Sequence, residues 1–296
     1  MSSPRTLFRS RSVPRGQSGP QLALTPRRAG WEYVGFAVRQ IAAGGTWSSR
    51  TGGDEVCLVL LGGLASAAWS HDKQGAAPHA GRASLGPRRD VFSGYPHALY
   101  LPPRTTFEIR AKRTSEIAEC RSPTAKRFAP RVIRPEDCGF EVRGGGNATR
   151  QIIDILPPAA EADRLLVCEV LTPAGNWSSY PPHKHDRHNP PVEADLEETY
   201  YYRFSEPGGY GIQRLYTLAD REEQVLRVTH GDLVMVREGY HPFVAAPGVD
   251  AYYLNTLAGS FRSMAATDDP RYAHLRASWP PPDPRVPMIA KPSTEG

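Results

Sequence analysis

Short apolar or alternating runs, separated by glycine- and proline-rich turns, fill the first half of the chain. Residues 31–41 alternate in part and are followed by Gly44-Gly45, and residues 56–61 form a continuous apolar run closed by Gly62-Gly63. Further short strands are predicted at residues 90–92, 98–101 and 106–111. Spacings of roughly ten residues are typical of a β-sandwich or barrel, and no helical period persists here.

A second series of strands starts near Gly139, after a proline- and arginine-rich link at 121–135. These strands are predicted at residues 151–156, 165–171, 198–204, 211–218, 224–228, 232–236, 241–245 and 251–257. Eight strands suffice for a closed jelly roll. The chain is therefore expected to be all-β, with two tandem jelly-roll barrels. The expected parts are a basic arm (1–30), a first barrel (31–125), a second barrel (126–262) and a C-terminal extension (263–296) with a polar, helical patch near 269–278.

The net charge of +5 comes from one end of the chain. Residues 1–30 contain six arginines, no lysine and no acid, so the rest is close to neutral and predicts no surface for nucleic acid. The arm is expected to be mobile, with its distal half packed on the first barrel. No apolar run is long enough to span a bilayer, and no secretory signal is evident. The four cysteines show no CxxC spacing, which favours a reducing, cytoplasmic compartment.

His183 and His185 stand two positions apart, so on a β-strand both imidazoles point to the same face. Imidazole is the commonest protein ligand for transition metals. Glu198 heads a strand face rich in tyrosine, where a carboxylate is costly unless it is paired or bound to a cation. His241 opens a later strand. Together these four side chains could hold one ion and leave positions open for water or substrate.

The residues alone leave alternatives open. His183 and His185 could mark a polar strand edge, and His241 could be a core histidine held by a backbone carbonyl. Glu197 competes with Glu198, because strand alternation turns only one of them inward. The other histidines considered are isolated or lie in predicted loops and are not expected to bind the ion: His71, His79, His97, His188 and His230.

This ligand order resembles the cupin pattern, with three departures. Thirteen positions separate His185 from Glu198, Arg237 stands where proline is usual, and a single residue separates Gly239 from His241. The extra segment, 186–196, contains two prolines and mixed charge and is expected to form a surface loop over the site.

The long run from Asn176 to Asp186, NWSSYPPHKHD, points to one particular family with this ligand order. Other matching segments are residues 30–36, 55–60, 143–151, 196–202, 213–216, 239–242, 252–259 and 268–270. Over roughly residues 20–275 the chain resembles the 5-deoxy-glucuronate isomerases of myo-inositol breakdown. A sibling family, the 5-keto-4-deoxyuronate isomerases of pectin breakdown, shares the ligand order but not the long run.

Two similar strand series in tandem suggest a bicupin, and the first half contains no HxH, so its barrel is expected to be structural. The resemblance implies metal ligation by His183, His185, Glu198 and His241, and an aldose–ketose isomerase that moves a proton between C1 and C2 of 5-deoxy-glucuronate, giving 5-dehydro-2-deoxy-gluconate. Zinc is expected from the sibling family, although manganese, iron, nickel and cobalt tolerate the same ligands.

Such a reaction needs a base, and its substrate ends in a carboxylate. Glu197, Lys184 and Tyr240 are the candidates chosen for proton transfer; Asp186, Tyr200 and Tyr202 also stay open. Arginine holds carboxylates bidentately, so Arg214 is the first candidate for that end, followed by Lys184 and Arg187, with Tyr180 in the pocket wall.

Other functions fit the same ligands. They are a cupin isomerase acting on another uronate, a ferrous-iron dioxygenase, and a sugar-sensing or storage cupin. The sensing function is disfavoured, because regulators of this kind usually carry a basic helix that reads DNA and the sequence predicts none. The expected partners are a small sugar acid and further copies of the chain, with no nucleic acid and no membrane.

Overall fold

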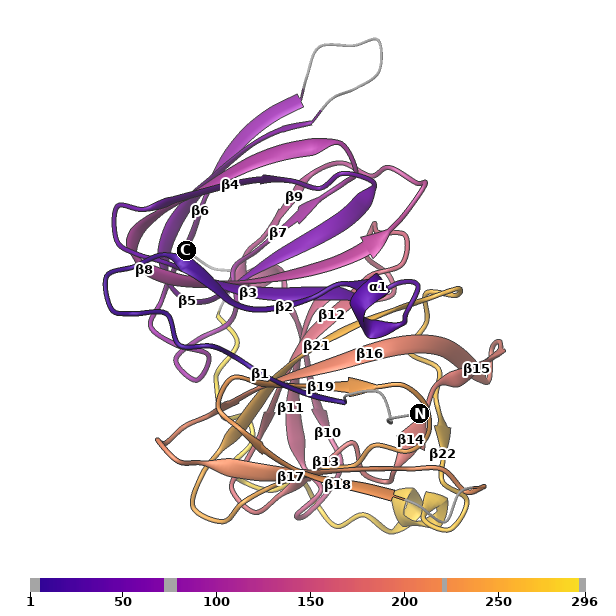
Figure 1. Cartoon of the computed structure of the whole chain (residues 1–296). Helices are drawn as coiled ribbons and strands as arrows, with labels where there is room; N and C mark the ends of the chain where they lie inside the picture. The colour runs from indigo at the N-terminus through magenta and orange to yellow at the C-terminus, as the bar shows by residue number, and fades with distance from the viewer. Residues whose placement is uncertain (1–5, 72–78, 220–222, 293–296) are drawn as a thin grey trace.

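The computed structural model describes residues 6–71, 79–219 and 223–292. Two β-barrels lie one above the other in Figure 1, and the colour changes from indigo and magenta to orange and yellow between them. In the described residues the helical segments are short: α1 (Pro26–Ala29) and the 3-10 turns η1 (Pro135–Asp137) and η2 (Ala273–Ser278). The predicted helical patch near 269–278 is η2.

The first barrel is one eight-stranded antiparallel sheet. Its order is β2-β3-β8-β5-β7-β9, with β4 paired to β8 and β6 paired to β5. The strands are β2 (Gly19–Leu24), β3 (Gly35–Ile41), β4 (Thr46–Arg50), β5 (Asp54–His71), β6 (His79–Arg88), β7 (Ala98–Leu101), β8 (Thr105–Pro123) and β9 (Arg131–Ile133).

Strand β5 is longer than the apolar run predicted. Gly62-Gly63 was expected to end it, but the pairing with β8 shifts register there and resumes as far as His71. Gly63 has φ +111, and a Cβ on it would clash with Ser115 Oγ, so the glycine permits a bulge rather than a turn. The predicted loop around His71 was therefore wrong: His71 is buried in β5 and its Nδ1 contacts Thr105 Oγ1. The strand predicted at 90–92 was also wrong, because Asp90 accepts from the amide of Phe92 and closes a turn.

The second barrel pairs an eight-stranded sheet, β1-β19-β16-β21-β12-β11-β10 with β15 on β16, with a four-stranded sheet, β13-β20-β17-β18. A small pair, β14-β22, completes it. The strands are β1 (Leu7–Arg9), β10 (Gly139–Arg143), β11 (Arg150–Leu156), β12 (Leu166–Thr172), β13 (Trp177–Ser178), β14 (His183–Lys184), β15 (Asp186–Asn189), β16 (Glu193–Phe204), β17 (Tyr210–Tyr216), β18 (Glu223–Thr229), β19 (Asp232–Val236), β20 (Phe243–Ala245), β21 (Ala251–Gly259) and β22 (Thr267–Asp268). All eight strands predicted for this half are present.

The segment 186–196 is a β-hairpin rather than the loop expected. β15 pairs with the first residues of β16, so the insertion extends the strand that carries Glu198. The N-terminal arm is also ordered over its described part: β1 pairs with β19 of the second barrel, and β2 joins the first. The link at 121–135 begins within β8, and β9 belongs to the first sheet through its pairing with β7.

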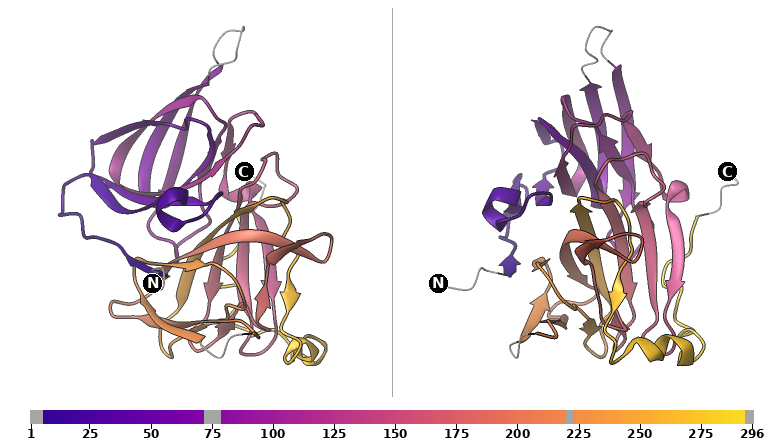
Figure 2. Two further views of the ribbon diagram at one scale, coloured as in Figure 1. Left: turned by 45° about the vertical axis from the view of Figure 1, so that its right-hand side comes forward. Right: turned by 90° about the vertical axis from the view of Figure 1, so that its right-hand side faces the viewer.

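The two barrels share one hydrophobic core. Its buried members come from both sheets, among them Phe36 and Val59 from the first and Tyr201 and Leu254 from the second. The rings of Phe36 and Tyr201 lie 5.4 Å apart. Figure 2 shows the sheets side by side along this boundary. The barrels therefore form one continuous packed unit, and the second barrel keeps a separate interior of its own.

Candidate metal centre

Four predicted ligands come together at one end of the second barrel. β14 carries His183, and His185 follows it directly; β14 is held by β22, where His183 pairs with Asp268. Glu198 lies on β16 opposite Val236 of β19, and His241 follows the turn after β19. Strand pairing thus joins ligands far apart in sequence, as the motif predicts.

The donor atoms are close enough to share one ion. Ligand atoms of His185, Glu198 and His241 all lie within 4.8 Å of one another, and all three residues are buried. Glu198 Oε2 lies 2.9 Å from His185 Nε2 and 3.3 Å from His241 Nε2. The ring centroid of His183 is 4.9 Å from that of His241 and 6.3 Å from that of His185, so His183 borders the group formed by the other three.

Backbone carbonyls orient two of the imidazoles. His185 Nδ1 contacts the carbonyl of Leu196 at 3.2 Å, and His241 Nδ1 contacts that of Gly239 at 3.0 Å. These contacts leave both Nε2 atoms toward Glu198, as in metal sites where a histidine donates its other N–H to a carbonyl. His241 Nε2 is fully buried and makes no hydrogen bond. A buried polar atom without a partner is costly, and a cation at this point would remove the cost. The residues therefore fit a divalent metal ion.

Burial keeps two of the ligands neutral. It lowers the pKa of His241 to about 4, and burial and the neighbouring imidazoles hold the pKa of His183 well below its usual value. Burial alone would also lower the pKa of His185, but the hydrogen bond and charge of Glu198 raise it. Neutral imidazole is the form that binds a metal.

A second layer of side chains fixes the segment that leads from His241 into β20. Gln213 Nε2 donates to the carbonyls of His241 and Pro242, and the hydroxyl of Tyr202 donates to Gln213 Oε1. The ring of Tyr200 lies 5.9 Å from that of His241, and its hydroxyl contacts Ser179 Oγ at 3.1 Å. Apart from the alternating tyrosines of β16, nothing in the sequence predicted this network.

Of the three residues predicted for proton transfer, Glu197 lies apart from Lys184 and Tyr240. Glu197 points away from the cluster: its carboxylate accepts from the backbone amides of residues 32–34 at 2.7–2.8 Å. That placement does not fit the predicted role as base. Lys184 faces away from its histidine neighbours and its Nζ contacts Asp186 and Glu193 at 2.6 and 2.7 Å. Tyr240 stacks on Tyr216 with centroids 5.3 Å apart.

Lys184, Tyr240 and Arg187 line a cavity of about 560 Å³ on the outer side of the β14 segment. Arg187, predicted to bind substrate, is exposed there. Asp186 lines the same cavity and accepts from the amide of Gly239 at 2.7 Å, which ties the HxH segment to the turn before His241.

The other two residues predicted to bind substrate lie elsewhere. Arg214 is bound to Glu223, with Nε to Oε2 at 2.7 Å, and its guanidinium lies over the ring of Tyr216. Tyr180 packs its ring between Trp177 and Tyr272. The carbonyl of Tyr180 accepts a hydrogen bond from Arg150, a buried residue for which the sequence predicted no role in the site.

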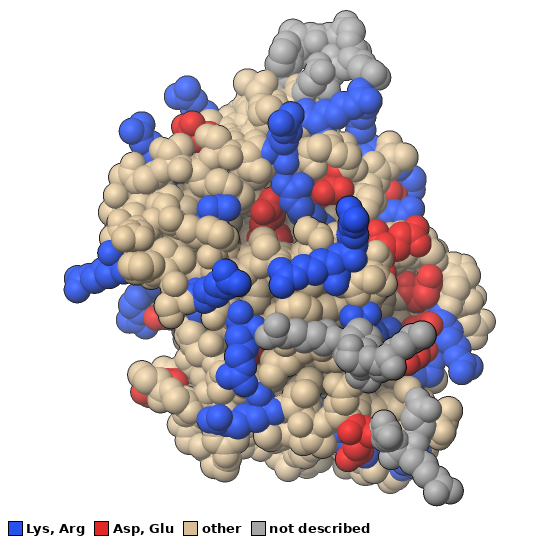
Figure 3. Space-filling model, in the orientation of Figure 1, with Lys and Arg blue, Asp and Glu red and all other residues tan. Residues whose placement is uncertain are grey.

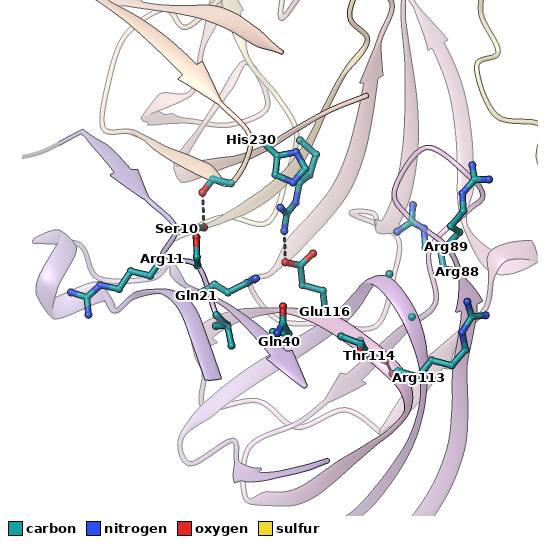
Figure 4. Close-up of a pocket in the computed structure, with 17 residues that line it drawn as sticks. Ser10, Arg11, Gln21, Gln40, Arg88, Arg89, Arg113, Thr114, Glu116 and His230 are labelled. Carbon is teal, nitrogen blue, oxygen red and sulfur yellow. Dashed lines mark hydrogen bonds and ion pairs between the residues drawn. The ribbon is translucent and has the colours of Figure 1, made fainter. Parts of the chain in front are cut away.

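A further polar cavity of about 560 Å³ lies between the barrels, away from the cluster (Figure 4). Arg203 and Glu116 pair across it at 2.6 Å. Of the arginines that Figure 4 labels, Arg88 pairs with Glu169, and Arg11, Arg89 and Arg113 point in different directions rather than toward one centre. On the face drawn in Figure 3, described Lys and Arg side chains are scattered over both barrels with neutral surface between them.

The fold and the cluster define a class: a bicupin with a buried histidine–glutamate group suited to a divalent metal. Comparison with solved structures agrees. Oxalate decarboxylase from Bacillus subtilis aligns with a TM-score of 0.63 at 11% identity, covering 90% of this chain and 79% of that one, which confirms the predicted fold. An IolB-like protein from Salmonella typhimurium LT2 aligns with a TM-score of 0.85 at 37% identity, covering 92% of this chain and 99% of that one.

The chain belongs to the KduI/IolB family, whose model matches residues 7–275. A protein named 5-deoxy-glucuronate isomerase from Geobacillus thermodenitrificans is 43% identical over 88% of this chain and 93% of its own length. One of the same name from Bacillus subtilis strain 168 is 36% identical over 81% of this chain and 86% of its own. The predicted family resemblance is confirmed. Within the described residues, no helix is long and apolar enough to cross a membrane.

Proposed function

We propose that this protein is a metal-dependent aldose–ketose isomerase that converts 5-deoxy-D-glucuronate to 5-dehydro-2-deoxy-D-gluconate in myo-inositol breakdown. Relatives of this name align over most of the chain, so the prediction of an isomerase is confirmed at the level of the family. The observation that carries the metal-dependent part is the convergence of His185, Glu198 and His241 within 4.8 Å.

His183, His185, Glu198 and His241 are the proposed ligands, with zinc as the proposed ion. Three imidazoles and one carboxylate suit zinc, which prefers nitrogen and oxygen ligands in such sites. When bound, the ion supplies Lewis-acid polarisation of a carbonyl oxygen and a template for an adjacent hydroxyl.

The chain's own residues shape access to this centre. His185 and His241 are buried, whereas His183 is partly exposed, so substrate approaches from the side of His183. The hydroxyls of Tyr200 and Tyr253 contact Ser179 and Ser178, which fixes them in the barrel wall above the cluster. Burial raises the pKa of both tyrosines, Tyr253 to about 12, so each is a neutral donor and not a base at neutral pH. Lys184 and Tyr240 remain predictions for proton transfer from the cavity side.

The test is an isomerase assay on 5-deoxy-glucuronate with protein stripped by chelator and then reloaded with single metals. We expect stripped protein to be inactive and zinc to restore turnover. Oxygen uptake recorded in the same reaction separates the isomerase from the ferrous-iron dioxygenase: the isomerase consumes none. Turnover of 5-keto-4-deoxyuronate but not 5-deoxy-glucuronate would favour the sibling activity instead.

We also propose that the protein works in the cytoplasm as a homo-oligomer. The four cysteines are free and buried, and no disulfide joins them, which suits a reducing compartment. The oligomer rests on the tendency of soluble enzymes to form symmetric assemblies.

A further inference from the structure

Arg150 opens strand β11 and points into the second barrel. Its neighbour on the same strand face, Ile152, belongs to the core of that barrel, whereas Ile153 belongs to the core shared between barrels. Side chains alternate along a strand, so Arg150 lies on the inner face. Only 3% of the residue is exposed.

Arg150 differs from the other deeply buried arginines in having no carboxylate partner. Arg88 is 3% exposed and pairs with Glu169 at 2.7 Å; Arg203 is 8% exposed and pairs with Glu116 at 2.6 Å. Arg150 donates only to the backbone carbonyls of Tyr180 and Ala148, both through Nη1, at 3.2 and 3.4 Å. No described carboxylate forms an ion pair with it. Glu141, an acid on which the charge of Arg150 acts, is already held by Arg143 at 2.6 Å.

An uncompensated buried cation is expensive to keep. Removing a guanidinium from water costs several kcal/mol unless a partner restores the lost interactions. Burial accordingly lowers the pKa of Arg150 to about 10, still well above neutral, so the side chain is charged. A charge held this way is prepared for an anion that arrives from outside the chain.

Arg150 also lies beside the metal cluster. The ring of Tyr200 lies 5.9 Å from that of His241, and the Tyr200 hydroxyl contacts Ser179, the residue before Tyr180. The carbonyl that it binds, at Tyr180, is three residues before His183. The cation and the cluster thus border the same part of the barrel interior.

We propose that Arg150 binds the carboxylate of the substrate while the opposite, carbonyl end lies at the His183–His185–Glu198–His241 cluster. This inference rests on the proposed function and names the residue that selects a uronate over a neutral sugar. A guanidinium presents parallel N–H donors that match the two oxygens of a carboxylate. Arg214, the residue predicted from sequence, already holds Glu223 and is one-third exposed, so it is a weaker candidate.

The test measures recognition of the carboxylate without requiring turnover. Metal-loaded full-length protein is titrated calorimetrically with D-glucuronate and with its neutral amide, D-glucuronamide, which has nearly the same shape. Wild type is compared with Arg150→Met, Arg150→Lys and Arg214→Met. Arg227→Met, on an exposed strand position, is the control for loss of one positive charge. Metal content and thermal midpoint are recorded for each variant.

We expect wild type to prefer the carboxylate by about 10- to 100-fold, the range of a charge-assisted pair. Arg150→Met should abolish the preference, and Arg150→Lys should retain part of it. Metal content should be unchanged, and the thermal midpoint should not fall, because an unpaired buried charge is removed. A merely structural Arg150 would instead lower the thermal midpoint and leave the preference intact.

Three results would overturn the inference: a preference that survives in Arg150→Met, a preference lost in Arg214→Met alone, or no preference in wild type. A wild type that shows the Arg150-dependent preference but does not isomerise 5-deoxy-glucuronate would contradict the proposed function and leave the role of Arg150 standing. A wild type that isomerises 5-deoxy-glucuronate, but whose preference for the carboxylate does not depend on Arg150, would contradict the role of Arg150 and leave the proposed function standing.

Discussion

The carboxylate of Glu198 lies 2.9 Å from Nε2 of His185, although an inserted hairpin separates the two residues in the chain. The hairpin extends β16 outward and leaves the inward position of Glu198 unchanged. Since both groups are buried, each depends on the other or on a cation between them.

Removing a ligand should remove the metal without unfolding the protein. We expect His183→Ala and Glu198→Gln each to abolish both bound metal and isomerisation, because each takes one donor from a four-donor set. Elemental analysis and circular dichroism check the two parts. His188→Ala, a change to an exposed histidine hydrogen-bonded to Asp195, is the matched control and should keep its metal.

Glu197 should matter for stability rather than for metal binding. Its carboxylate accepts three backbone amides from the segment that leads into β3, so Glu197→Ala should lower the free energy of unfolding by about 2 kcal/mol. Denaturant unfolding followed by fluorescence measures this. A variant of unchanged stability that had lost its metal would show that the carboxylate serves the cluster after all.

A buried ion pair joins the two barrels. Arg88 of the first forms two hydrogen bonds with Glu169 of the second, at 2.7 and 2.8 Å, and Tyr252 also donates to Glu169. Arg88→Met should cost about 3–5 kcal/mol, because it leaves a buried carboxylate without its cation.

The control for this pair is Arg89→Met, since the side chain of Arg89 is 79% exposed and surface pairs are worth under about 1 kcal/mol. The double variant Arg88→Met/Glu169→Leu should recover part of the loss. Equal effects of Arg88→Met and Arg89→Met in chemical denaturation would refute the claim that the buried pair stabilises the junction.

Asp283 fastens the C-terminal segment to the second barrel and gives a pH dependence. Hydrogen bonds from Arg285 hold the pKa of Asp283 well below its usual value, and Asn176 also donates to it. A carboxyl with a lowered folded pKa stabilises fully above its unfolded pKa and loses that contribution as the pH falls through the lowered value.

Protection of residues 279–290 from hydrogen exchange, relative to the intrinsic rate at each pH, should therefore persist at neutral pH and be lost only below the usual aspartate range. Asp283→Asn should show fast exchange already at neutral pH. Exchange that is equally slow in both proteins would remove Asp283 as the fastening group.

The sequence predicted local features better than distant ones. Strand alternation showed that only one of Glu197 and Glu198 could face inward, and the family resemblance selected Glu198. Spacing placed His183 with His185, because residues two apart on a strand share a face. It missed the bulge at Gly63, since only the approach of Ser115 from β8 shows that the strand continues. Arg150 lies in one of the matching segments, but its lack of an acidic partner is apparent only in the folded barrel. The sequence did not show that Arg214 is paired with Glu223, because only the pairing of β17 with β18 brings the two side chains together.

The most direct test is elemental analysis of the purified protein combined with turnover of 5-deoxy-glucuronate. The account predicts one divalent ion per chain, with zinc as the expected metal. Activity should be lost on chelation and restored when the metal is added back. A His183→Ala protein that contains no metal and still isomerises the substrate at the wild-type rate would contradict it.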